Sequence, residues 1–95
     1  MQVEIKNINT QMDQALVRTI REHFEKSWWK NWPLKRMEVY IYQKNKNLRS
    51  IGIACNTGDQ LYFNNAFDLD FEQAFYSALY KLEQQIMNST LHTEL

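Results

Sequence analysis

The chain has 95 residues, enough for one domain with a single core. Its composition, with 44% hydrophobic and 14% aromatic residues, two Gly and one Pro, excludes a disordered or low-complexity segment. The formal net charge is zero, yet ten of the eleven Lys and Arg residues lie in residues 1–50, against five of the eleven acids. Such asymmetry indicates either an anionic partner for the first half or two solvated faces.

Nothing in the sequence predicts contact with a membrane. No apolar run approaches the roughly 20 residues that cross a bilayer, and Met1 is followed by an alternating stretch rather than a signal peptide. The lone cysteine, Cys55, fits a reducing compartment. We therefore expect a cytoplasmic protein.

The first elements in the chain are a strand and a helix. Residues 2–8 alternate between apolar and polar side chains, which predicts a strand. Thr10, with Asp13 three residues later, predicts the start of a helix that ends near Lys30, before Pro33. Apolar residues recur every four positions along this helix: Met12, Leu16, Ile20, Phe24 and Trp28.

Three strands should follow. Residues 35–43 alternate, with Met37 facing the core and Tyr40 and Tyr42 facing out, and residues 50–55 alternate in the same way. The sequence 56–59, with Gly58 free to take a positive φ, predicts a turn into the fourth strand. In that strand we expect Leu61 and Phe63 to face the core.

The clearest element is a second helix over residues 70–88. Asp70, with Gln73 three residues later, predicts its N-terminal cap. A stripe at three- and four-residue steps should be its buried face: Phe71, Phe75, Ala78, Leu79, Leu82 and Ile86.

The predicted order is β-α-β-β-β-α, an α+β fold in which two helices pack on one face of a four-stranded sheet. The last three strands should form an antiparallel meander, and the first should run parallel to the second. We expect a single domain over residues 1–90 and a mobile tail over residues 91–95.

One family shares this order and several of these residues. The second helix reads D-F-x-x-A-F-x-x-A-L-x-K-L-x-x-Q-I from Asp70 to Ile86. With Ala15-Leu16, Ile20, Phe24 and Lys26 in the first helix, and Asn56-Thr57-Gly58 in a turn, the chain resembles the bacterial ribosome hibernation-promoting factor and ribosome-associated inhibitor family (sigma-54 modulation protein-like). The similarity covers nearly the whole chain, mostly at core and cap positions.

The resemblance implies a protein without catalytic residues or cofactor, which binds the small ribosomal subunit and inhibits translation in stress or stationary phase. Lys26 and Lys81 match basic positions of the family, which implies contacts with rRNA. The lysine-rich tail of the family is missing here. From the charge asymmetry, we expect further basic residues to take part in RNA binding: Arg18, Arg21, Lys30, Lys35 and Arg36.

The residue types that carry enzyme chemistry are sparse. His23, His92 and Cys55 have no metal-ligand spacing, and no phosphate-binding loop or nucleophile motif is present. We expect Cys55 to be a buried structural thiol and His23 to be a helical surface or core residue. The sequence thus predicts no metal, no cofactor and no small-molecule substrate.

Exposed aromatic residues leave a second interpretation open. Trp29 and Trp32 lie among basic residues, and Tyr76 and Tyr80 flank the buried stripe of the second helix. These four side chains suit either stacking on bases or contact with a protein. The alternative function is therefore a diverged member of the same fold, without RNA binding, that pairs with a protein or with a second copy of itself.

Overall fold

A computed structural model describes residues 2–11, 13–26, 35–58 and 60–93. Its elements follow the predicted order, and their bounds are β1 Gln2–Asn7, α1 Gln14–Lys26, β2 Arg36–Asn45, β3 Leu48–Asn56, β4 Leu61–Asp68 and α2 Phe71–Thr93. The predicted α+β fold is confirmed. Trp28, Trp29, Lys30 and Trp32 lie outside the described residues.

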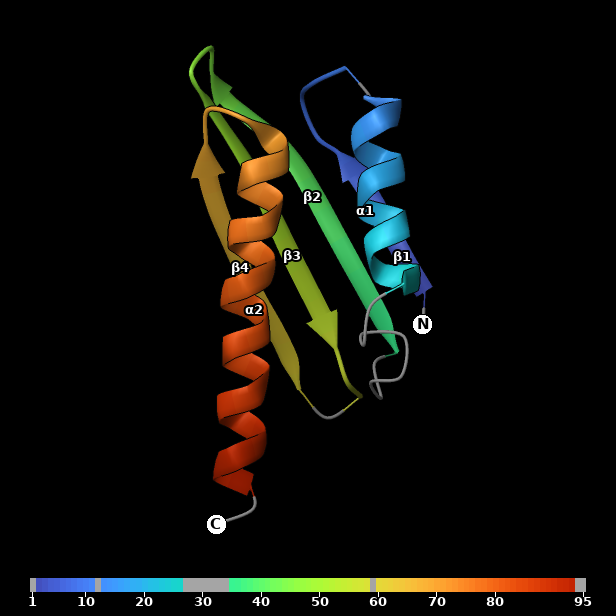
Figure 1. Ribbon diagram of the computed structural model, residues 1–95, viewed down its shortest axis with the longest axis vertical. Coiled ribbons are helices and arrows are strands. Elements are labelled where there is room, and N and C mark those ends of the chain that lie inside the picture. The colour runs from blue at the N-terminus through green and yellow to red at the C-terminus, as the bar shows by residue number, and fades with distance from the viewer. Residues whose placement is uncertain (1, 12, 27–34, 59, 94–95) are drawn as a thin grey trace.

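The four strands form one sheet in the order β1-β2-β3-β4. β1 runs parallel to β2, which pairs antiparallel with β3, and β3 pairs antiparallel with β4. Both helices lie on the same face of this sheet (Figure 1). The opposite face, called the outer sheet face below, is covered by no helix of the described chain.

The core lies between the helices and the inner sheet face. α1 contributes Leu16, Ile20 and Phe24, which are buried as the four-residue period predicts. α2 contributes Ala74, Phe75, Ala78, Leu79, Leu82 and Ile86, all with at most 3% of their surface exposed. The strands contribute Met37, Val39, Ile41, Ile51, Ile53, Cys55 and Ala66.

Asp13, rather than Thr10, caps the first helix. The Asp13 Oδ1 atom accepts hydrogen bonds from the backbone N–H groups of Ala15 (3.0 Å) and Leu16 (3.3 Å). The Thr10 hydroxyl instead donates to the Asn7 side chain at 2.7 Å. Asp and Thr are both good caps, so the sequence pattern alone set the helix start too early.

The second helix starts where the sequence predicts, because the Asp70 carboxylate accepts a hydrogen bond from the N–H of Glu72 at 3.0 Å. It runs to Thr93, past the predicted end at Asn88, and its last turns extend beyond the sheet (Figure 1). Of the predicted tail over residues 91–95, residues 94 and 95 lie outside the described residues.

The predicted orientation of β4 is wrong. Leu61 and Phe63 point to the outer sheet face and are 73% and 53% exposed, while Tyr62 packs against the core. This orientation is set by the turn at Gly58, whose φ is 100°. The Thr57 N–H donates to the Gln60 carbonyl across this turn, and the resulting register pairs Cys55 with Tyr62. Cys55 is buried, and paired residues share a sheet face, so Tyr62 must point inward.

A cluster of rings joins the two helices. The Phe75 ring lies edge-on to Phe24, with ring centres 5.8 Å apart, and His23 lies edge-on to both Phe75 (5.7 Å) and Tyr76 (6.0 Å). Burial lowers the pKa of the His23 ring, and the charge of Glu83 acts in the opposite direction. Folding therefore favours the neutral form of His23.

Phe75→Ala should lower the free energy of unfolding by about 3–5 kcal/mol, because Phe75 is fully buried and the ring cluster would lose its centre. Tyr80→Ala is the matched control on the same helix. Tyr80 is 63% exposed, so its loss should change stability by about 0.5 kcal/mol or less. Urea unfolding that showed equal losses would contradict the orientation of α2.

The state of His23 predicts a pH dependence. In the unfolded chain His23 titrates near pH 6.5, whereas in the folded protein its pKa is lower. As the pH falls below about 6.5, the unfolded chain takes up a proton that the folded protein does not, so stability decreases. Urea unfolding between about pH 8 and 5.5 should show this decrease in the native protein and a smaller one in His23→Gln. An unchanged slope in the variant would contradict the prediction.

Candidate functional site

Two of the predicted RNA-binding residues lie one turn apart on α1. Arg18 and Arg21 are both exposed. The Arg21 guanidinium donates to the carbonyl oxygen of Val3 at 3.4 Å, which directs it toward the free edge of β1. Arg18 forms no ion pair with any residue in the described ranges.

Arg36 is differently placed, because it lies on the outer sheet face between two carboxylates. Its guanidinium pairs with Glu4, and its Nε atom lies 3.1 Å from the Glu38 carboxylate. Lys6 lies 3.3 Å from the other oxygen of Glu38, and its Nζ atom is 5.5 Å from the centre of the Tyr40 ring. These opposite charges on β1 and β2 balance one another.

The pKa values follow from this arrangement. The hydrogen bond from the Tyr40 hydroxyl, with that from Lys6, lowers the pKa of the Glu38 carboxyl. The same contact with Glu38 raises the pKa of Tyr40, and the hydrogen bond to Glu38 raises that of Lys6. All of these groups hold their usual charge at neutral pH, so the network stays balanced.

The other basic residues lie on different parts of the surface. Lys81, on α2, points its Nζ atom at the Asn65 carbonyl on the free edge of β4, at 3.5 Å. Lys35 is exposed before β2, where its side chain lies against Gly58. Lys26 is the last residue of α1. Its side chain, and all of Lys30, lie outside the part of the chain that the structure describes. The described members of the set thus lie on several parts of the surface: Arg18 and Arg21 on α1, Lys35 beside the Gly58 turn, Arg36 on the outer face and Lys81 at the β4 edge.

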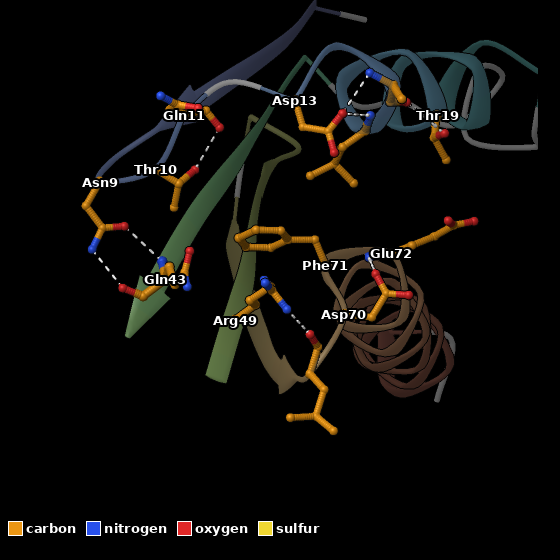
Figure 2. Close-up of a pocket in the computed structure, with 13 residues that line it drawn as sticks. Asn9, Thr10, Gln11, Asp13, Thr19, Gln43, Arg49, Asp70, Phe71 and Glu72 are labelled. Atoms are coloured by element: carbon orange, nitrogen blue, oxygen red, sulfur yellow. Dashed lines mark hydrogen bonds between the residues drawn. The ribbon is translucent and has the colours of Figure 1, made fainter. Parts of the chain in front are cut away.

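A hollow of about 730 Å³ lies where the two helices begin. Figure 2 shows Phe71 pointing into it, with Asp13 and Arg49 on opposite sides of the ring. The Arg49 guanidinium donates to the Leu69 carbonyl and lies 5.5 Å from the centre of the Phe71 ring.

The chemistry of this hollow does not suit phosphate. Asp13 and Asp70 each accept the cap hydrogen bonds through one carboxylate oxygen, and Glu72 adds a third carboxylate against the single guanidinium of Arg49. The Asn9 side chain bonds the backbone of Gln43 in both directions, at 2.8 Å each. The hollow therefore holds structural caps and a net negative charge, and repels a polyanion.

Cys55 is structural, as its position in the predicted strand indicates. It is fully buried on the inner sheet face. Burial raises the pKa of its thiol to about 11, which leaves very little of the nucleophilic thiolate near neutral pH. Within the described ranges, no three His, Cys, Asp or Glu side chains gather where they could hold a metal ion. No helix there is both long and apolar enough to span a bilayer.

The exposed aromatic surface is larger than the sequence predicts. Tyr76 and Tyr80, two of the four predicted partner residues, are 41% and 63% exposed. Phe63 and Phe67 on the outer sheet face are 53% and 49% exposed, and the sequence interpretation missed them. The sequence did contain a signal for this exposure: aromatic residues occupy both alternating positions of β4, which places aromatic side chains on both faces of the sheet.

Comparison with known proteins gives matches among solved structures alone. No family model matches the chain, and no curated protein does. Seventeen chains of solved structures match. One of them, a ribosomal subunit interface protein from Coxiella burnetii, superposes with a TM-score of 0.85 over 96% of this chain and 99% of that chain, at 12% sequence identity. The chain therefore has the fold of a ribosomal subunit interface protein, and the resemblance inferred from the sequence is confirmed for the fold.

Proposed function

We propose that this protein is a cytoplasmic, non-catalytic ribosome-associated factor that binds the small ribosomal subunit and inhibits translation under stress. The observation that carries the proposal is the structural match over 96% of this chain to a ribosomal subunit interface protein. The function requires no catalytic group, which agrees with a buried Cys55 and with two carboxylates of the hollow, Asp13 and Asp70, that act as helix caps.

Binding to rRNA would depend on local clusters of positive charge, because the chain as a whole has a net charge of zero. Each Lys or Arg that neutralises a phosphate releases a counterion, and this release supplies most of the non-specific affinity. α1 is the best source of such contacts. It carries the exposed Arg18 and Arg21 and ends at Lys26, and Lys30 follows it in sequence.

The remaining members of the predicted set would contribute unequally. Lys35 and Lys81 are exposed and suit supporting contacts. Arg36 already neutralises Glu4 and Glu38, so a phosphate would have to compete with both carboxylates. We therefore rank Arg18 above Arg36 as an RNA contact.

Co-sedimentation with small ribosomal subunits at increasing salt tests this proposal. The affinity should fall as salt rises. Arg18→Ala should weaken binding and reduce the log–log salt slope by somewhat less than about one unit. Arg36→Ala is the matched control, and it should change the slope less.

Two results would contradict the proposal. Native protein that stays off small subunits even at low salt would end the ribosomal function. Binding that is insensitive to salt and to Arg18→Ala would reject contacts with phosphate and would favour a protein partner through Tyr76 and Tyr80.

A further inference from the structure

The outer sheet face has a large apolar part. Phe63, Phe67 and Leu61 stand along β4, and Tyr42 stands on β2. Between these strands β3 presents the small residues Ser50, Gly52 and Ala54 (these three form the floor of the face), with the polar Asn56 at its end. The Phe63 ring lies over Gly52, where an added Cβ would come within 3.1 Å of it. Exposed apolar groups at this density indicate an interaction surface.

The polar part of the same face is electrically neutral. Glu4 and Glu38 are matched by Lys6 and Arg36 on neighbouring strands. A polyanion such as RNA needs net positive charge, and a strongly basic protein needs net negative charge. A neutral apolar face on a chain of zero net charge instead suits a neutral partner with the same pattern.

The strand register arranges the outward side chains in four rows across the sheet. The first row contains Arg36 and Leu61, and the second contains Glu4, Glu38 and Phe63. The third contains Lys6, Tyr40 and Asn65, and the fourth contains Tyr42 and Phe67. A two-fold axis can run parallel to these rows, across the strands and midway between the second and third rows. A rotation of 180° about this axis places row one over row four and row two over row three of the other copy.

We propose that the outer sheet face binds the same face of a second copy around this axis. Glu4 then faces Lys6 of the other copy and Leu61 faces Phe67, so unlike charges meet at the first pair and apolar groups at the second. Arg36 faces Tyr42 and Phe63 faces Asn65, so the aromatic side chains of these two pairs meet polar groups. Isologous interfaces of this type are the commonest in homodimers, and two stacked sheets pack about 10 Å apart with their strands nearly aligned.

The size of the face agrees with such a dimer. Four strands about 4.8 Å apart and about 26 Å long give a flat area of roughly 500 Å². Because side chains project from the sheet, the area that each partner buries is larger than this flat area. It approaches the roughly 600 Å² per partner at the lower end of specific interfaces. We therefore expect a small interface and a weak, transient dimer. The inference rests on the sheet alone and does not depend on ribosome binding.

Sedimentation velocity of the full chain, from micromolar to millimolar concentration, tests the proposal. The native protein should shift from monomer to dimer, and Phe63→Lys should raise the dimer dissociation constant at least tenfold. Tyr80→Lys, at an exposed aromatic residue on the helical side (63%, against 53% for Phe63), should leave it unchanged. Leu61→Lys, at a position 73% exposed, gives a second variant should Phe63→Lys unfold.

The same samples identify the face in contact. On dilution, amide NMR signals of β2, β3 and β4 should move, while those of α2 should stay. A native protein that is monomeric at millimolar concentration would overturn the proposal. It would also be overturned by a dimer that persists in both lysine variants of β4, or by one that Tyr80→Lys disrupts.

Discussion

The α2 helix packs against β3 and β4 on the inner sheet face and buries Phe75, Leu82 and Ile86, and the other features of the fold depend on this contact. Each large side chain stabilises the folded state by about 1.5–3 kcal/mol when fully buried. Ala74 and Ala78 of the same helix are fully buried as well, and their small size lets the helix backbone approach the sheet. Because both helices cover the inner face, the outer face has to meet solvent or a partner.

The helices could be predicted from sequence because each has one apolar stripe with a single phase. Phe75 and Ile20 are buried in the predicted positions. The orientation of β4 could not be predicted, because apolar residues occupy both of its alternating positions. The sequence pattern therefore does not decide whether Tyr62 or Phe63 faces the core. The choice is made by the register of the turn at Gly58, which depends on hydrogen bonds between Thr57 and Gln60.

The positions of the charges were harder to predict than the fold. Arg36 and Glu4 are 32 residues apart in sequence, and only the parallel pairing of β1 with β2 brings them together. Nothing in the local pattern around Arg36 separates it from Arg18, yet one is paired on the outer face and the other is exposed on α1. The sequence thus identified a basic half of the chain, and the fold divides that half among several surfaces.

The two proposals concern different sides of the molecule. Exposed cations on α1 suit phosphate, whereas the neutral outer sheet face suits a second copy. The most direct test of this account is a cryo-EM reconstruction of small ribosomal subunits incubated with the protein. The account predicts density for the domain with α1 against rRNA and the outer sheet face turned away from it. Subunits without such density, or a domain bound to rRNA through its outer sheet face, would contradict the account.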